Sequence, residues 1–341
     1  MFSTRIFRLF AARCLPILLA MVVLLGGCAA EPDAPDKGAS APDASAPVES
    51  ASSQPSAPDG PSADTSAGES DVTPGGSVRY VLCTEDDLHR GDLLLVNRTA
   101  PYDASLCAGE ITDVRSGRVT NIQEGTYALP IEKSLLQTME ALQTGMQQAM
   151  GDGVCLLIND SYRSAAAQQA TIDEYLALYG QAYVDKYVAP VGYSEHHTGL
   201  AVDMSFYNPS NGAVMATTSA EAAAHYAWIL ENCRRYGLIL RYPPGKEAVA
   251  GTAETWHFRY VGIPHAGYIA SNDLVLEEYM DILKKTSLEQ PLYITADGEA
   301  YSVYYVPATG DETLVPVPAD KSYTLSGNNA DGFIVTVKEN G

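Results

Sequence analysis

The side chains best suited to chemistry are concentrated in two short segments of this 341-residue chain. The first runs from Ser194 to Asp203 (SEHHTGLAVD), and the second from Glu254 to His257 (ETWH). Two imidazoles and a carboxylate can hold a divalent metal ion and leave one coordination position open. A further carboxylate beside that position can move protons for a water molecule on the metal. The two segments therefore predict a metal-dependent hydrolase, with zinc as the expected cofactor.

The spacing within the first segment suits a shared centre. His196 and Asp203 are seven residues apart, and Gly199 lies between them, so the chain can turn and direct both side chains to one point. Leu200–Asp203 alternates as a strand does, so Asp203 is expected to point away from the apolar face. The adjacent His197 is an equally good ligand by spacing, and the residues alone do not choose between the two histidines.

The second segment places a carboxylate near its histidine only if the strand is irregular. Glu254 precedes His257 by three residues, so on an ideal strand the two side chains would face opposite ways. A loop before the strand, or a bulge in it, must bring Glu254 back to the metal. That position suits a base beside the metal better than a fourth ligand.

Hydrophobic periodicity predicts an α+β fold, in which an antiparallel sheet with flanking helices holds the metal site. Strands are expected at Val78–Cys83, Leu93–Asn97, Val154–Ile158, Leu200–Asp203, Leu238–Tyr242 and Trp256–Val261, and helices near residues 131–150, 164–187, 218–237 and 274–285. Residues 287–341 are expected to form a small β-rich C-terminal appendage, which either packs on the catalytic domain or binds another molecule. Its predicted parts are a hairpin within 293–306 and a strand at Phe333–Val337.

The N-terminal residues predict export. Three arginines, an apolar stretch at Leu15–Leu25 and small residues before Cys28 indicate a signal peptide over residues 1–28. Its ending resembles a bacterial lipoprotein signal, in which Cys28 becomes the lipid-bearing first residue; a plain signal peptide cleaved near Ala29 or Ala30 is the alternative. Residues 29–77 are rich in Ala, Ser and Pro, and are expected to form a disordered tether. The expected location is extracytoplasmic, on the outer face of the cell membrane. The lipid on Cys28 is expected to attach the protein to that membrane.

The net charge bears on possible binding partners, and the cysteines bear on possible disulfides. The formal net charge of −21 leaves no basic patch, so we expect no nucleic-acid partner. We also expect the protein to be a monomer. Cys83 and Cys107 flank a short section and could form a disulfide outside the membrane. Cys155 and Cys233 are expected to be buried thiols.

Several ordered motifs resemble one known family. The pattern Ser-x-His-x-x-Gly-x-Ala-x-Asp, followed by Glu-x-x-His, is similar to that of the VanY-type D-alanyl-D-alanine carboxypeptidases of the zinc-dependent M15 peptidases. The resemblance extends upstream to Ser161–Ser164 and Gln168, and downstream through Tyr236–Pro243 and Trp256–Gly262. It covers roughly residues 90 to 286, so residues 78–286 are the expected M15-type zinc peptidase domain.

The resemblance assigns a role to each site residue. It implies that the zinc ligands are His196, Asp203 and His257, which makes His197 a neighbour. It implies that Glu254 is the general base and that Arg163 binds the terminal carboxylate of the substrate and polarises the scissile carbonyl. Ser161, Gln168 and Ser194 match positions near the substrate. The chain departs from the pattern at Thr255, where proline is usual, and at Asn159-Asp160, where a Ser-Gly type entry is common.

The implied reaction is the removal of terminal D-alanine from peptidoglycan stem pentapeptides. An L,D-carboxypeptidase or an endopeptidase acting on the same stems is the first alternative. The second is a wall-binding lipoprotein without activity. The presence of both Glu254 and Arg163 argues against the second, because binding alone needs no base.

Overall fold

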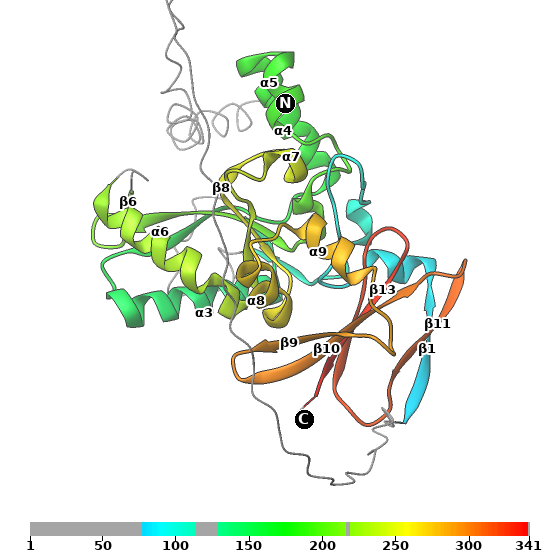
Figure 1. Cartoon of the computed structure of the whole chain (residues 1–341). Coiled ribbons are helices and arrows are strands. Elements are labelled where there is room, and N and C mark those ends of the chain that lie inside the picture. Colours follow the sequence, from blue (N-terminus) through cyan, green and yellow to red (C-terminus); the bar gives the residue numbers. More distant parts are fainter. Residues whose placement is uncertain (1–76, 114–128, 216–218, 340–341) are drawn as a thin grey trace, which may run out of the picture. The chain divides into compact units, whose positions relative to one another are not determined.

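The computed structural model describes residues 77–113, 129–215 and 219–339 (Figure 1). The predicted signal peptide, Cys28 and residues 29–76 of the predicted tether lie outside the described residues. Within the described part, none of the helices combines the length and the apolar character needed to cross a membrane.

The described residues form a mixed α+β fold, as predicted. The helices are α3 (Lys133–Met150), α4 (Ala165–Tyr179), α5 (Gln181–Tyr187), α6 (Ala220–Asn232), α7 (Glu247–Ala250), α8 (Ile263–Ser271) and α9 (Leu276–Leu283), with 3-10 turns η1 (Glu85–His89), η2 (Ala104–Leu106), η3 (Glu195–Thr198) and η4 (Cys233–Tyr236). The strands are β1 (Val78–Thr84), β2 (Ile111–Asp113), β3 (Pro130–Glu132), β4 (Cys155–Asp160), β5 (Ala201–Asn208), β6 (Ala213–Val214), β7 (Leu238–Tyr242), β8 (Glu254–Tyr260), β9 (Leu292–Ala296), β10 (Glu299–Pro307), β11 (Glu312–Pro318), β12 (Tyr323–Gly327) and β13 (Gly332–Lys338).

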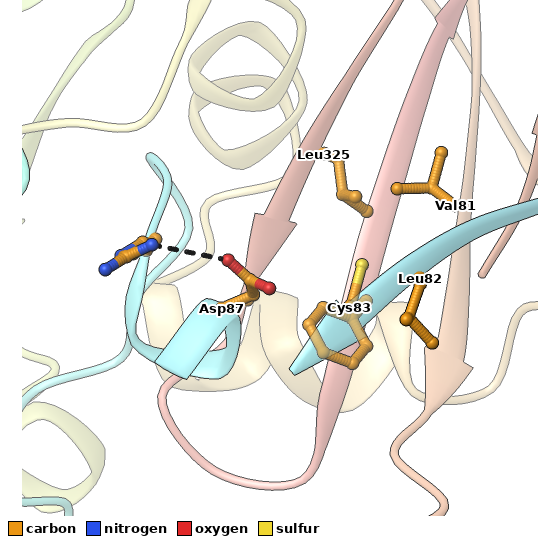
Figure 2. Close-up of a pocket in the computed structure, with 8 residues that line it drawn as sticks. Val81, Leu82, Cys83, Asp87 and Leu325 are labelled. Atoms are coloured by element: carbon orange, nitrogen blue, oxygen red, sulfur yellow. Dashed lines mark ion pairs between the residues drawn. The ribbon is translucent and has the colours of Figure 1, made fainter. Parts of the chain in front are cut away.

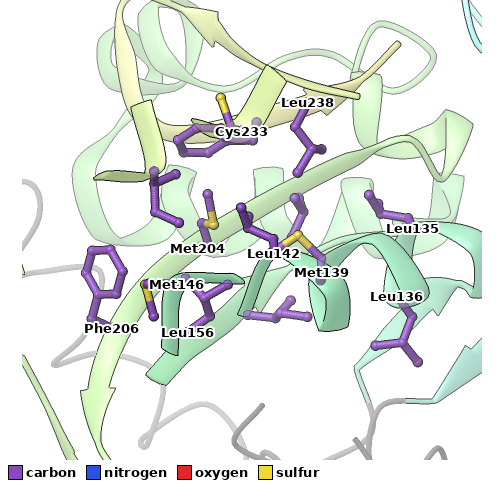
Figure 3. Packing of buried hydrophobic residues seen from close by; sticks show 14 of the residues in the cluster. Leu135, Leu136, Met139, Leu142, Met146, Leu156, Met204, Phe206, Cys233 and Leu238 are labelled. Atoms are coloured by element: carbon purple, nitrogen blue, oxygen red, sulfur yellow. The ribbon is translucent and has the colours of Figure 1, made fainter. Parts of the chain in front are cut away.

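An antiparallel sheet in the order β4-β5-β8-β7, with β6 paired to β5, carries the candidate site. One face of this sheet is apolar, and α3 and α6 contribute to the same core (Figure 3). Along β5 the buried core residues are Val202, Met204 and Phe206, which alternate with Asp203 and Ser205. Because side chains of a strand alternate between faces, Asp203 is left on the face opposite this core.

The C-terminal segment is β-rich, as predicted, but one of its strands pairs with β1, near the start of the described residues. Strands β12-β13-β10-β9 form one antiparallel sheet, while β11 pairs with β1 along seven residue pairs. Figure 1 shows β1, near the start of the described chain, beside β11. A core cluster that includes Cys83, Tyr304, Val315 and Phe333 lies between the two sets of strands. Strands β11 and β12 and the pairing of β11 with β1 were not predicted from the sequence.

A second core cluster joins the C-terminal strands to the catalytic part. Ile294, Val303 and Ile334 share it with apolar residues of α8 and α9, including Ile269 and Met280. Of the two expectations for the C-terminal segment, the structure therefore supports packing on the catalytic domain. The predicted boundary after residue 286 crosses this shared core.

Residues 93–97 do not form the predicted strand. Leu93, Leu94 and Val96 are buried as a strand would require, but the segment holds only an isolated bridge between Asn97 and Ala100. Its backbone finds other partners, because the Leu93 amide donates to Ser326 Oγ (2.9 Å) and the Leu94 carbonyl accepts from Arg259. The apolar run at residues 93–96 therefore indicates burial correctly but does not form a strand.

All four cysteines within the described residues are free thiols, so the Cys83–Cys107 disulfide that the sequence allowed is not formed. Cys83 lies on β1 in the C-terminal core cluster. Cys107 lies beside η3, where its Sγ contacts the carbonyl oxygen of Thr198 (3.3 Å). As expected, Cys155 and Cys233 are buried.

A pocket of about 190 Å³ lies beside β1 and β12 (Figure 2). Its walls are apolar except for Asp87 and Arg90, which form an ion pair of 3.5 Å. None of the predicted metal ligands lines it, so it is separate from the candidate active site.

His265 connects three elements and should make stability depend on pH. Its Nδ1 lies 2.7 Å from Tyr279 Oη on α9, and its Nε2 lies 3.0 Å from Thr336 Oγ1 on β13. Burial lowers the pKa of His265 from 6.5 to about 3. The unfolded chain therefore binds this proton more tightly, so the contribution to stability is complete above pH 6.5 and is lost as the pH falls toward 3.

We expect His265→Gln to remove this pH dependence. Between pH 7.5 and pH 5, the wild type should lose about 2 kcal/mol of unfolding free energy relative to the variant. Urea unfolding of both proteins at the two pH values measures the difference. A difference that does not change with pH would contradict the prediction.

Candidate metal centre and active site

The three predicted metal ligands converge in the structure. One donor atom from each of His196, Asp203 and His257 lies within 4.8 Å of the other two. Asp203 Oδ1 is 3.6 Å from His196 Nε2 and 3.2 Å from His257 Nδ1. Donors about 2.1 Å from a tetrahedral zinc ion are about 3.4 Å apart, so the observed spacing matches a zinc-sized cation.

Two local features produce this convergence. Gly199 ends η3 in the left-handed region (φ 76°), and a Cβ there would lie only 3.1 Å from the Glu132 side chain, so glycine suits this turn. The turn returns the chain into β5 soon after His196. In the antiparallel pairing of β5 with β8, Asp203 lies directly opposite His257. Neighbouring strands therefore supply two ligands, and the preceding turn supplies the third.

Hydrogen bonds distinguish His196 from His197. The Nδ1–H of His196 donates to the carbonyl of Ser161 (2.6 Å), which leaves Nε2 free to face Asp203. His197 uses both ring nitrogens: Nδ1–H donates to the Arg163 carbonyl (2.6 Å), and Nε2 accepts from the Gly192 amide (3.0 Å). His197 therefore has no ring nitrogen left for a metal, which answers the question that spacing alone left open.

Glu195 orients the third ligand and was not assigned a role from the sequence. Its Oε2 lies 3.3 Å from His257 Nε2, so the other ring nitrogen of His257 faces the metal position. Its Oε1 accepts from Arg241 (2.7 Å) and Arg259 (2.9 Å). Burial raises the pKa of Glu195, but the two guanidinium groups outweigh it and hold the pKa well below the usual range.

The electrostatics of the cluster favour a cation. Asp203 Oδ1 is buried and has no hydrogen-bond partner among the described residues. Burial raises the pKa of Asp203, but His196 and His257 reverse the effect and keep that pKa below its usual value. Burial lowers the pKa of His257, yet Asp203 and Glu195 raise it overall to about 10. The cluster therefore binds positive charge tightly, and a divalent ion on these donors would supply it.

Glu254 reaches the site through a bulge. The pairing of β7 with β8 shifts between Leu240 opposite Phe258 and Tyr242 opposite Glu254, so β8 has extra residues there. This brings Glu254 Oε2 to 3.6 Å from His257 Nδ1, although the two residues are three apart. Burial raises the pKa of Glu254, and the nearby Asp203 carboxylate also raises it, whereas His257 lowers it. The bulge predicted as one of two ways to bring Glu254 inward is confirmed.

Arg163 lies next to the metal-binding turn. Its backbone amide donates to the carbonyl of His196 (3.0 Å). Its guanidinium forms an ion pair with Asp160 and donates to Gln168 Oε1 (2.6 Å). Burial lowers the pKa of Arg163, but Asp160 outweighs this and raises it, so the cation persists. Asp160 is one of the departures from the family pattern, and in the structure it is the ion-pair partner of Arg163.

The remaining predicted substrate-binding residues support the site from behind. Ser161 is fully buried, and its hydroxyl donates to the Ala201 carbonyl (3.0 Å). Gln168 is also fully buried and holds Arg163 while donating to the Ala189 carbonyl (2.6 Å). Ser194 precedes η3 and is almost fully buried. Direct contact of these three side chains with substrate stays a prediction.

Comparisons with known proteins show which family the chain belongs to. Residues 132–263 match the family model VanY, D-alanyl-D-alanine carboxypeptidase. The chain is 35% identical over 259 residues to a D-alanyl-D-alanine carboxypeptidase of Enterococcus faecium, covering 74% of this chain and 77% of that protein. It is 33% identical over 210 residues to a D-alanyl-D-alanine carboxypeptidase of Enterococcus faecalis strain V583, covering 59% and 69% of the two chains.

A solved structure resembles the fold. The vancomycin resistance D,D-dipeptidase VanXYg, in complex with a D-Ala-D-Ala phosphinate analog, aligns with a TM-score of 0.63 and 27% identity. The alignment covers 77% of this chain and all of that one. The family model spans the predicted ligands His196, Asp203 and His257 together with Arg163 and Glu254. The chain belongs to the VanY-type D-alanyl-D-alanine carboxypeptidases of the M15 peptidases.

Proposed function

We propose that this protein is a zinc-dependent D,D-carboxypeptidase that removes the terminal D-alanine from peptidoglycan stem pentapeptides. The observation that carries the proposal is the convergence of two imidazoles and one carboxylate, with a second carboxylate, Glu254, 3.6 Å from His257. Such a donor set is the one zinc takes in catalytic sites with an open position. The proposal is also supported by the similarity to the D-alanyl-D-alanine carboxypeptidases of Enterococcus faecium and Enterococcus faecalis.

His196, Asp203 and His257 would hold the zinc ion. When bound, the ion supplies Lewis acidity that makes water a nucleophile near neutral pH. The buried partners of the two imidazoles, the Ser161 carbonyl and the Glu195 carboxylate, fix which ring nitrogen of each histidine faces the ion.

Glu254 would transfer the proton during peptide hydrolysis. Its carboxylate accepts a proton from the attacking water while the oxygen of that water bonds to the carbonyl carbon of the D-Ala–D-Ala peptide. The same proton then moves to the leaving nitrogen as the carbon–nitrogen bond breaks, which releases D-alanine. A raised pKa suits this double role, because the group must both take and return a proton.

Arg163 would bind the anionic end of the substrate and the charge that develops on the carbonyl oxygen. Its guanidinium stays charged and is held by Asp160 and Gln168, so it needs little reorganisation when substrate binds. A strongly acidic protein does not attract anions through its general field. A fixed local cation is therefore the feature that lets this site take a peptide carboxylate.

Zinc-loaded protein incubated with defined stems tests the substrate. We expect a pentapeptide ending in D-Ala-D-Ala to lose one alanine, while a tetrapeptide and a pentapeptide ending in L-Ala stay intact. Mass spectrometry of the stems before and after incubation measures each product. Cleavage of the tetrapeptide would instead indicate an L,D-carboxypeptidase, and an internal cut an endopeptidase. Binding without turnover would indicate a wall-binding protein.

We also propose that Cys28 carries a lipid that anchors the enzyme at the outer face of the cell membrane. The proposal is supported by the basic leader, the apolar Leu15–Leu25 stretch and the small residues before the cysteine. Residues 29–77 would then separate the enzyme from the bilayer and let it reach wall peptides.

Cys28→Ser should move the protein from the membrane fraction to the soluble fraction. A serine cannot carry the thioether-linked lipid, and the apolar chains supply the membrane affinity. Cell fractionation and labelling with a radioactive fatty acid measure the change. Ser53→Ala, in the same predicted tether, serves as a control that should stay with the membrane. A Cys28→Ser protein that is still labelled and membrane-bound would rule out this anchor.

A further inference from the structure

A buried ionic network extends from the metal centre to helix α9. Glu195, which contacts His257, accepts hydrogen bonds from Arg241 and Arg259. The two terminal nitrogens of Arg241 then donate to the two carboxylate oxygens of Glu277, at 2.9 and 2.6 Å. Glu277 lies in the first turn of α9, beyond the residues 132–263 that match the family model.

The charges of this network balance only if Glu277 is present. Glu195, Arg241 and Arg259 have no exposed side-chain surface, and Glu277 is 15% exposed. Two carboxylates therefore face two guanidinium groups in a nearly dry environment. Loss of Glu277 would leave Arg241 with a buried charge that Glu195 must share with Arg259. Arg241 would also lose the paired contact with Glu277 and keep only the hydrogen bond from its Nε to Glu195.

Glu277 itself is held by the C-terminal part of the chain. Helix α9 buries Leu276, Met280 and Leu283 in the core cluster that includes Ile294 and Ile334 of the C-terminal sheet. The side-chain amide of Asn97 also donates to Glu277 Oε1 (3.1 Å). The position of the Glu277 carboxylate therefore depends on strands that follow the catalytic segment in sequence.

We propose that Glu277 is a positioning residue for the metal centre, and that the C-terminal segment supports the orientation of His257 through it. The order of contacts is α9, Glu277, Arg241, Glu195 and His257. The proposal rests on the proposed metal site and not on the identity of the substrate. The proposal gives residues 287–341 a role that does not require them to bind another molecule. Their sheet packs against α9, the helix that carries Glu277.

Zinc affinity of the full-length protein tests the proposal without any peptide substrate. We expect Glu277→Gln to weaken Zn²⁺ binding about tenfold in competition with a chromogenic chelator, within the range that loss of an outer partner costs. The same variant loaded with Co²⁺ should show altered visible absorption bands, because these report the ligand geometry. Glu278→Gln, the control, removes a carboxylate from the same helical turn. The Glu278 carboxylate contacts Lys246 and the Val275 amide, and not Arg241. The control variant should bind Zn²⁺ as the wild type does.

Circular dichroism of each metal-free variant establishes that it is folded. If Glu277→Gln does not fold, Arg241→Lys decides the question, because lysine keeps the charge and loses the two-pronged contact with Glu277. A folded Glu277→Gln, or in its place a folded Arg241→Lys, with wild-type zinc affinity and an unchanged cobalt spectrum would overturn the proposal. Absence of peptidase activity in the wild type would refute the proposed function and leave this result standing.

Discussion

Glu254→Ala is expected to retain zinc and to lose D-alanine release by about 10²–10⁴-fold in kcat, the range that one general acid–base group contributes. The carboxylate lies 3.6 Å from His257 Nδ1, beside the metal position, but the other three donors already form the cluster. Without it, no side chain takes the proton of the attacking water or returns it to the leaving amine. Zinc content by elemental analysis and D-alanine release from a pentapeptide stem measure the two effects.

Glu247→Ala is the matched control for this prediction. Glu247 is an exposed glutamate on α7 whose carboxylate accepts a hydrogen bond from the Gly245 amide. The Glu247→Ala substitution therefore removes the same charge as Glu254→Ala, but outside the site. The control enzyme should release D-alanine at the wild-type rate. A Glu254→Ala enzyme as fast as this control would exclude Glu254 as the base.

His196→Ala is expected to abolish stoichiometric zinc binding, whereas His197→Ala should keep it. Loss of a direct ligand should cost more than the about 10–100-fold reduction in affinity seen when outer partners are removed. His196 presents a free Nε2 to Asp203. Both ring nitrogens of His197 are engaged by backbone groups. The same substitution at His196 and at His197 therefore tests which of the two histidines is the metal ligand.

Elemental analysis after dialysis against metal-free buffer measures the zinc content of both variants. Because His197 also holds the Arg163 carbonyl, the comparison concerns bound metal and not catalytic rate. Equal zinc content in the two variants would show that His196 is not a ligand. Zinc lost from His197→Ala alone would exchange the roles of the two histidines.

Much of the site could be predicted because its parts obey local rules. Gly199 signalled a turn, and alternation along Leu200–Asp203 placed the aspartate on the face opposite the core. The three-residue separation of Glu254 and His257 required an irregular strand, and β8 has a bulge there. These deductions need only the chain's own stereochemistry.

The support of the site depends on partners far apart in sequence. Glu195 stands beside a ligand, yet its partners Arg241 and Arg259 lie on strands that only the folded sheet brings together. One signal was available: side chains alternate along a strand, so Arg259 must lie on the same side of the strand at Trp256–Val261 as His257. A buried arginine requires an anionic or carbonyl partner, and an acid next to a metal ligand was a candidate for it.

The wrong strand at residues 93–97 has a similar cause. An apolar stretch reports that its side chains are buried, but it does not report which groups its backbone bonds. Here Ser326 and Arg259 supply those bonds from distant elements. The missed strands β11 and β12 contain Pro316, Pro318, Ser326 and Gly327, which weaken a strand pattern until neighbouring strands impose it.

The pairing of β1 with β11 has a consequence for the order of folding. The two strands form seven residue pairs, although nearly the whole described chain separates them in sequence. Closing so long a loop is entropically costly, and such non-local contacts slow folding. During synthesis from the N-terminus, β1 stays without its partner until residues 312–318 of β11 have been made. Until then the backbone edge of β1 is unpaired, and it lies beside apolar side chains (Val78, Tyr80 and Leu82) that even the native fold does not bury. This interval is therefore the stage at which aggregation is most expected.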